Sequence, residues 1–126
     1  MRRVLCVTAV SVLVGACGGG GSGSAHTATC SPSGTRLAIA AANVAYDKSC
    51  LAAPANQAFT ITFHNEDSGT PHNVDIVDPS GDSVFRGPIV NGVTTTTYHV
   101  RGMKPGLYTF RCDAHPDTMK GTFVVK

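Results

Sequence analysis

The chain has 126 residues, with ten Lys and Arg, eight Asp and Glu, and five His, which gives a formal net charge of +2. This length suits one domain with a single hydrophobic core and is too short for two ordinary domains. Arg2 and Arg3 lie in the leader predicted below, and without them eight cationic residues face eight acidic ones, with no basic stripe. The balance argues against nucleic acid as a partner.

The first sixteen residues have the pattern of a secretory signal. Two arginines precede an apolar run from Val4 to Val14, which is too short to span a bilayer as a mature helix. The residues VGAC, ending at Cys17, resemble the lipobox of bacterial lipoproteins, in which the cysteine becomes the lipid-carrying N-terminus. We predict a lipoprotein-type signal peptide at 1–16 with Cys17 as the lipidated mature N-terminus. The alternative is an ordinary cleaved signal with a cysteine nearby.

Residues 17–29 are rich in Gly and Ser (CGGGGSGSAHTAT). Such a segment cannot bury a core, so we predict a flexible tether here and a folded domain at 30–126. An acylated end anchors a protein without a membrane span. The sequence therefore predicts an exported protein, attached to the cell membrane by a lipid on its extracytoplasmic side.

Three of the five cysteines remain when the one in the leader and the lipidated one are set aside. In an exported, oxidising setting two of the three are expected to pair. Cys30 and Cys50 bracket the start of the folded part, and a disulfide between them would stabilise it by about 3 kcal/mol. Cys112 is then left as a free thiol, for which metal ligation is a leading reason.

The folded part has the pattern of short strands separated by turns. Their spacing, without a convincing long helix, predicts an all-β sandwich or barrel. In one strand the alternation places Val74 and Ile76 on the same face. The alanine-rich stretch Ala38–Ala53 is less regular and leaves a helical turn or an irregular edge open. Strands are predicted at 37–44, 58–63, 73–77, 93–100, 107–111 and 120–126.

Three side chains with soft or borderline donor atoms lie close together near the C-terminus. Two residues separate Cys112 from His115 and three separate His115 from Met119, in a loop between two predicted strands. A thiolate, an imidazole and a thioether together suit copper, whereas zinc seldom uses a thioether. Such a site needs a second imidazole from elsewhere in the domain, and His72, directly before a predicted strand, is the candidate.

Other interpretations of these residues remain open. Cys112 could be an inert buried thiol, and Met119 could belong to the core. Cys112 and His115 could act as nucleophile and base, but that needs an orienting third group and a substrate cleft, and neither is visible in the sequence. His64 and His99 lack partners at comparable spacing, and we expect them to be structural or exposed.

The segments TPHNV (70–74) and FRCDAHPDTMKGTFVV (110–125) together resemble the cupredoxins, the small blue copper proteins such as plastocyanin and amicyanin. The resemblance extends over most of the folded part, including the stretch GMKPGLYTFRC that leads to the cysteine. It implies a Greek-key β-sandwich that binds one type 1 copper ion.

The resemblance also implies a role for each matching residue. His72, Cys112 and His115 correspond to the trigonal copper ligands, and Met119 corresponds to the long axial ligand. Asn73 matches the asparagine that, in many family members, ties the two ligand loops together near the cysteine sulfur. The spacing from His115 to Met119 lies between the amicyanin-like and plastocyanin-like loops.

Four protein ligands leave no open position for a substrate, so the resemblance implies an electron carrier and not an enzyme. The chain has no His-x-His pair and one cysteine in its loop, which argues against multicopper oxidases and binuclear copper centres. We expect a membrane-tethered monomer whose redox partner proteins dock near the exposed edge of His115. Pro71 and Pro116 beside the two histidines favour an apolar docking patch.

Two alternatives share part of this pattern. A cell-surface or periplasmic copper-binding protein that sequesters or delivers the metal would need the same ligands. A sandwich without metal, used for adhesion or interaction, would need none of them. Colour with copper(II) distinguishes the sandwich without metal from the two copper-binding possibilities, the electron carrier and the protein that sequesters or delivers copper.

Overall fold

Eleven β-strands make up the regular structure of residues 29–126, the part of the chain that this computed structural model describes. The predicted signal peptide, Cys17 and most of the predicted tether lie outside the described residues. Within the described part, no helix has the length and hydropathy needed to cross a membrane. The strands are β1 (Arg36–Ala42), β2 (Ala45–Tyr46), β3 (Cys50–Ala53), β4 (Phe59–Asn65), β5 (Pro71–His72), β6 (Asp75–Val77), β7 (Ser83–Arg86), β8 (Val90–Asn91), β9 (Thr94–Val100), β10 (Gly106–Arg111) and β11 (Lys120–Val125).

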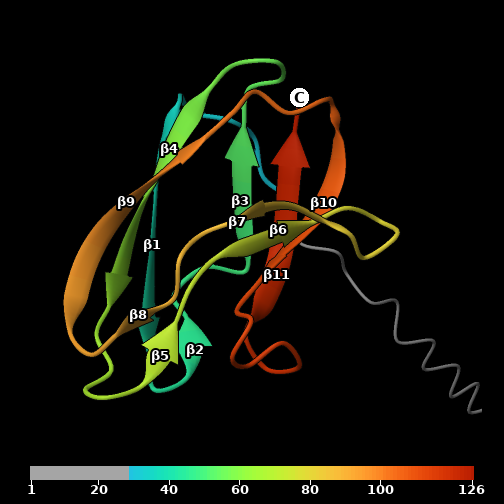
Figure 1. Cartoon of the computed structure of the whole chain (residues 1–126). Coiled ribbons are helices and arrows are strands. Elements are labelled where there is room, and N and C mark those ends of the chain that lie inside the picture. Colours follow the sequence, from blue (N-terminus) through green and yellow to red (C-terminus); the bar gives the residue numbers. More distant parts are fainter. Residues whose placement is uncertain (1–28) are drawn as a thin grey trace, which may run out of the picture.

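The strands form two facing sheets and a short ribbon. One sheet has the order β2-β1-β4-β9, the other has the order β3-β11-β10-β6-β7, and β5 pairs with β8. In Figure 1, β1, β4 and β9 lie on the left and β3, β11 and β10 on the right. The pairs β1–β4 and β3–β11 are parallel, so the chain crosses between sheets, and the other pairs are antiparallel. This confirms the predicted all-β, Greek-key β-sandwich.

Alternating side chains of the central strands fill the space between the sheets. In β4 the period-two pattern buries Phe59, Ile61 and Phe63 on one face. Phe59 stacks on Phe123 of the opposite sheet with 5.6 Å between the ring centroids. The rings therefore join the two layers, and burial of each such side chain stabilises the fold by roughly 1.5–3 kcal/mol.

The alanine-rich stretch forms strands and no helical turn. In β1, Leu37, Ile39 and Ala41 are buried in turn against the neighbouring strand β4. A two-residue loop, Asn43 and Val44, then leads into β2, and both residues have positive φ, of 53° and 57°. Such left-handed pairs are typical of tight hairpins, although a β-branched residue adopts this conformation at a cost.

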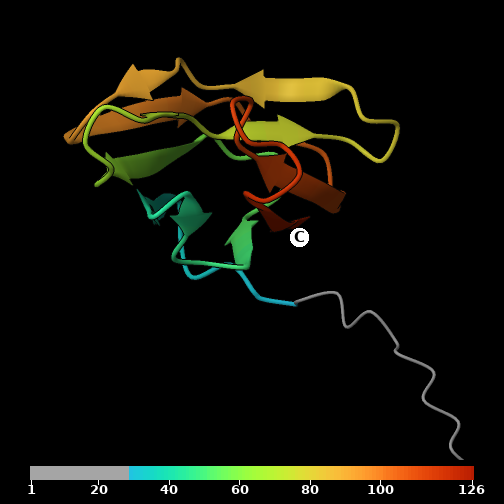
Figure 2. The same cartoon turned by 90° about the horizontal axis from the view of Figure 1, so that it is seen from below.

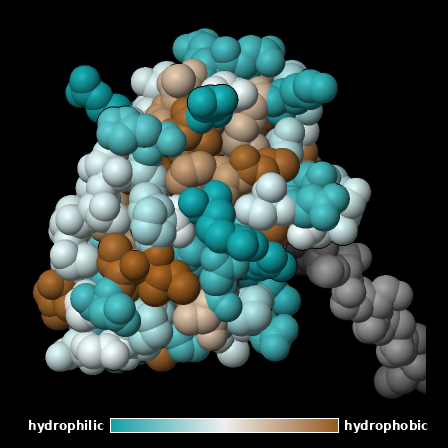
Figure 3. Space-filling view, viewed as in Figure 1, coloured by the Kyte–Doolittle hydropathy of each residue, from teal (hydrophilic) through white to brown (hydrophobic). Residues whose placement is uncertain are grey.

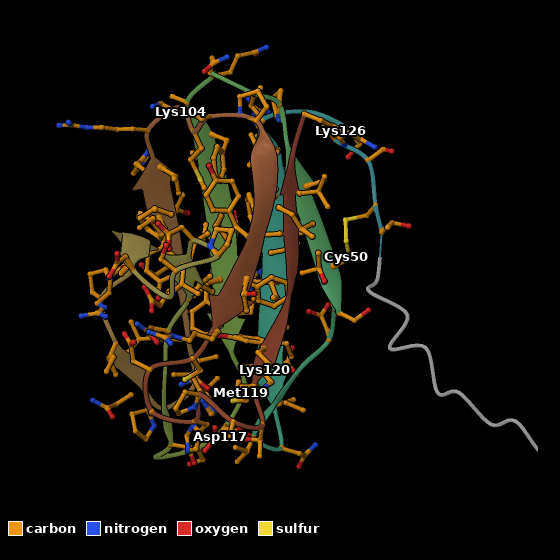
Figure 4. The ribbon with its side chains drawn as sticks, turned by 90° about the vertical axis from the view of Figure 1, so that its right-hand side faces the viewer. Cys50, Lys104, Asp117, Met119, Lys120 and Lys126 are labelled. Carbon is orange, nitrogen blue, oxygen red and sulfur yellow. A yellow bond between two sulfur atoms is a disulfide. The ribbon has the colours of Figure 1, made fainter. Side chains whose placement is uncertain are left out.

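A disulfide joins Cys30 to Cys50, as predicted. It links the segment before β1 to the first residue of β3, across 20 positions of sequence. Figure 4 shows Cys50 on the flank of the molecule, away from the end that holds Met119. Among the described residues the free cysteine is Cys112, and it is buried.

Candidate metal centre

The predicted ligand loop connects β10 to β11 at one end of the sandwich. It begins directly after the last register pair of these strands, Arg111 and Lys120. The N–H of Cys112 donates to the carbonyl of Met119 at 2.9 Å, and the N–H of Met119 donates to the carbonyl of His115 at 2.9 Å. These two bonds hold the loop in shape through its own backbone. Figure 2 shows the loop, in red, lying across this end.

His72, Cys112 and His115 meet at this end, although the first two are 40 positions apart in the sequence. Their donor atoms all lie within 4.8 Å of one another. Nδ1 of His72 lies 3.7 Å from Sγ of Cys112, and Nδ1 of His115 lies 3.8 Å from the same sulfur. Both imidazoles therefore turn the same type of nitrogen toward the thiol. Within residues 29–126 no other group of three His, Cys or acidic residues converges in this way.

Exposure differs among the four predicted ligands. His72, Cys112 and Met119 are each 0% exposed, whereas His115 is half-buried. Met119 belongs to the same buried cluster as Cys112 and lies in the loop just before β11, where Figure 4 labels it. The edge of His115 is therefore the part of this set that reaches the surface.

Asn73 connects the two segments that carry the predicted ligands. Its Nδ2 donates to Oδ2 of Asp113 and to the carbonyl of Gly87, each at 2.8 Å, and its Oδ1 accepts from the N–H of Asp113 at 2.9 Å. The hydroxyl of Tyr46 donates to the carbonyl of Asn73. Burial, and after it the nearby Cys112, raises the pKa of Tyr46, so its phenol stays protonated as a donor.

Asp67 was missed by the sequence analysis and contacts a predicted ligand directly. Its Oδ2 lies 2.8 Å from Nε2 of His72, on the side of the ring away from Cys112. The same carboxylate accepts backbone N–H bonds from Asn43 at 2.6 Å and Val44 at 2.9 Å. The Val44 N–H, then His72, then the Asn43 N–H hold the pKa of Asp67 below its ordinary value. In the sequence, Asp67 was one polar residue of a turn, and no short-range pattern connects it to the hairpin.

Charged residues behind the ligand loop are paired and do not form an open patch. Asp75 is completely buried and lies 3.0 Å from Nε of Arg111 and 3.7 Å from Nε of Arg86. Asp113, beside the predicted cysteine ligand, lies 3.2 Å from Nε of Arg86. Arg86 therefore contacts both carboxylates, and the charges of these two aspartates and two arginines offset one another.

The remaining described histidines take no part in this group. Nδ1 of His64 lies 2.9 Å from Oγ1 of Thr95, and His99 is exposed. His99 lines a cavity of about 420 Å³ together with Lys104, which lies at the opposite end of the molecule from Met119 (Figure 4). The two histidines are thus structural or exposed, as expected.

Comparisons with known proteins agree with this geometry. The family model described as "Cupredoxin-like domain" matches residues 17–125. Reduced auracyanin from the photosynthetic bacterium Roseiflexus castenholzii is 25% identical, with a TM-score of 0.66, over 73% of this chain and 97% of that one. No curated protein sequence matches the chain.

Two further structural matches show the same fold in different settings. A reduced Cu(I) form of an amicyanin variant is 24% identical, with a TM-score of 0.55, over 72% of this chain and 82% of that one. A copper-containing nitrite reductase from Thermus scotoductus is also 24% identical, with a TM-score of 0.55, over 72% of this chain but 22% of that one. The fold therefore occurs both as a small protein and as a fraction of a much longer enzyme chain.

Proposed function

The chain belongs to the cupredoxin family, and from this premise we propose that it is a membrane-tethered type 1 copper protein that carries single electrons between redox partners. The observation that supports this most directly is the convergence of the donor atoms of His72, Cys112 and His115 within 4.8 Å. The matching auracyanin and amicyanin structures are of proteins in reduced forms, the second with Cu(I), which supports a redox role.

The donor set fits copper. One thiol, two imidazoles and a thioether combine soft and borderline donors, and three imidazole or thiol donors with a weak axial methionine are typical of blue copper sites. His72, Cys112 and His115 would hold the ion as its strong ligands, and Met119 would supply the weaker thioether donor. A bound copper ion would supply the capacity to gain and lose one electron.

The protein's own residues restrict what else can happen at this site. His72, Cys112 and Met119 are 0% exposed, so a substrate cannot reach their donor atoms from solvent. The backbone bonds between Cys112, His115 and Met119 hold the loop in one shape. A site that keeps its geometry in both oxidation states needs little rearrangement, which favours fast electron exchange over chemistry on a substrate.

Electrons would enter and leave through the half-buried His115. Pro116, the next residue in the chain, is exposed. Ile89 is 49% exposed and directly precedes Val90, the residue of β8 that pairs with His72. Figure 3 shows hydrophobic surface over the region where Figure 1 labels β8. Because the neighbouring charges of Asp113 and Arg86 are paired, we infer that redox partner proteins dock on an apolar surface here.

The absorption spectrum of the mature protein with copper(II) tests the metal assignment. We expect an intense blue or green colour from sulfur-to-copper charge transfer, and Cys112→Ser should abolish it. A wild-type protein that stays colourless would overturn the proposal. Repeated one-electron reduction and oxidation with the metal retained would separate an electron carrier from a protein that sequesters or delivers copper.

Membrane attachment rests on the sequence alone. The apolar run from Val4 to Val14, the VGAC segment and the Gly/Ser-rich stretch support a signal peptide at 1–16, a lipid on Cys17 and a tether to residue 29. Growth with a labelled fatty acid should label the wild-type protein and not Cys17→Ala, and the variant should leave the membrane fraction. An unlabelled wild type would refute the anchor and leave the copper assignment untouched.

A further inference from the structure

We propose that Asp67 is a positioning residue of the metal centre, whose carboxylate holds the His72 ring in the tautomer that leaves Nδ1 free to bind the metal. This inference rests on the proposed function and adds a residue that neither the sequence pattern nor the family resemblance identified.

The hydrogen bond between Asp67 and His72 determines which ring nitrogen carries the proton. Nε2 of His72 lies 2.8 Å from Oδ2 of Asp67, and a carboxylate can only accept. A neutral imidazole has one N–H and one lone pair, so Nε2 carries the hydrogen and Nδ1 keeps the lone pair. That Nδ1 lies 3.7 Å from Sγ of Cys112, on the side of the proposed metal position.

Burial leaves His72 few alternatives. Its side chain is 0% exposed, while the Asp67 side chain is 16% exposed. Without the carboxylate, the Nε2 hydrogen of a buried ring would lose its acceptor, which is costly unless the ring turns or changes tautomer. The contact therefore fixes both the orientation and the protonation pattern of this ligand, as partners of metal-binding histidines commonly do.

Asp67 is itself fixed by the β1–β2 hairpin. Its two carboxylate oxygens accept the N–H groups of Asn43 and Val44, and its own N–H donates to Oδ1 of Asn65 at 3.0 Å. The two N–H groups point at one carboxylate from a tight turn in which both residues have positive φ. A turn more than 20 residues earlier in the chain is thereby connected to a proposed ligand through one side chain.

The charge of the carboxylate has a separate effect. A negative group bonded to a ligand imidazole makes it a stronger donor and favours the more highly charged Cu(II) over Cu(I). Loss of such a partner typically lowers metal affinity 10–100-fold. If the loss is confined to Cu(II), a tenfold change corresponds to a rise of about 59 mV in the potential of a one-electron couple.

Two substitutions separate geometry from charge. Asp67→Ala removes the acceptor, whereas Asp67→Asn keeps an acceptor oxygen and removes the charge. Asp47→Asn is the matched control, because Asp47 also accepts a backbone N–H of the hairpin region, from Ala40 at 2.7 Å, and pairs with Lys48, but contacts no proposed ligand.

Two measurements on the mature protein give the readouts. Imidazole ¹⁵N spectra of the copper-free protein should show His72 as a single Nε2–H tautomer in the wild type, Asp67→Asn and Asp47→Asn, and not in Asp67→Ala. Chelator competition and voltammetry should show about tenfold or greater loss of Cu(II) affinity and a raised potential in both Asp67 variants, with Asp47→Asn unchanged.

Several outcomes would overturn the proposal. It is wrong if folded Asp67→Ala keeps the single tautomer and the wild-type potential, or if Asp47→Asn changes both as strongly. If Asp67→Ala does not fold, the copper-free wild type decides: ¹⁵N spectra that show the His72 hydrogen on Nδ1, or a mixture of tautomers, reject the proposal. The copper-free spectra test the role of Asp67 even if the wild type fails to form a coloured copper site, so the failures of the two proposals are distinguishable.

Discussion

Asn73 and Asp113 bind each other reciprocally across the end of the sandwich. Nδ2 of Asn73 donates to Oδ2 of Asp113, and the N–H of Asp113 donates back to Oδ1 of Asn73. Asn73 follows His72 in the chain, and Asp113 follows Cys112. The pair therefore sets the distance between two proposed ligands before any metal binds.

Asn73→Ala should destabilise the copper-free protein substantially. It leaves the N–H of Asp113 and the carbonyl of Gly87 without their partners, and each buried unsatisfied group costs about 1–3 kcal/mol, so we expect a loss of about 3 kcal/mol. Urea unfolding measures it. Asn91→Ala, at an exposed position of β8, should stay within about 0.5 kcal/mol of the wild type. Equal effects of the two substitutions would show that the Asn73–Asp113 pair does not hold the loops.

Met119→Leu should keep the colour with copper(II) and raise the reduction potential. Leucine fills a similar volume at this completely buried position, so the fold should lose less than about 1.5 kcal/mol. It has no thioether to stabilise Cu(II) at the axial position. Met103→Leu is the control, because Met103 is also buried, at 8% exposure, but lies outside the ligand loop. If both variants keep the wild-type potential, Met119 is a core residue and not a ligand.

The longer strands were predictable because their residue patterns are visible locally. In β4 the period-two pattern runs over seven residues, and β9 begins with a run of β-branched threonines. The two-residue strands β2, β5 and β8 are too short for any period to appear. They exist because neighbouring segments meet there, as where His72 pairs with Val90, and that meeting depends on the whole fold.

The same distinction applies to the candidate site. His72, Cys112 and His115 were identified from donor chemistry, spacing and family resemblance, and the structure brings their donor atoms together. Asp67 could not be found in this way, because its partners are backbone N–H groups of a distant hairpin. The alternation in residues 73–77 also gave no sign that Asp75 is completely buried. Asp75 is covered by Arg111 and by a residue of β7, and the pattern within 73–77 does not reveal either contact.

Replacing both Cys30 and Cys50 by serine should lower stability without changing the copper spectrum. The disulfide closes a separation of 20 residues, for which the chain-entropy model gives about 3 kcal/mol. The lost bond lies on the flank of the sandwich, away from the end with Met119 (Figure 4). Thermal unfolding and the absorption spectrum check the two halves of this prediction. A changed spectrum in the folded variant would mean that β3 influences the ligand loop.

A charge introduced beside the proposed electron port should slow electron exchange without altering the potential. Ile89→Glu places a carboxylate on the apolar surface next to β5, where two molecules would meet during self-exchange. Like charges facing each other across an interface cost several kcal/mol, so we expect a decrease of about tenfold or more at low salt. Leu107→Glu is the control. Leu107 is also an exposed aliphatic residue, at 52% exposure against 49% for Ile89. It lies near the start of β10, at the other end of that strand from Cys112.

The salt dependence of the rate completes this test. Wild-type exchange should depend weakly on ionic strength, because the docking surface is apolar, whereas the Ile89→Glu rate should recover as salt screens the added charge. Line broadening in NMR spectra of mixed oxidised and reduced protein gives both rates. If Leu107→Glu slows exchange as much as Ile89→Glu, electrons do not leave through the surface around His115. A steep salt dependence in the wild type would instead show that charged residues guide docking.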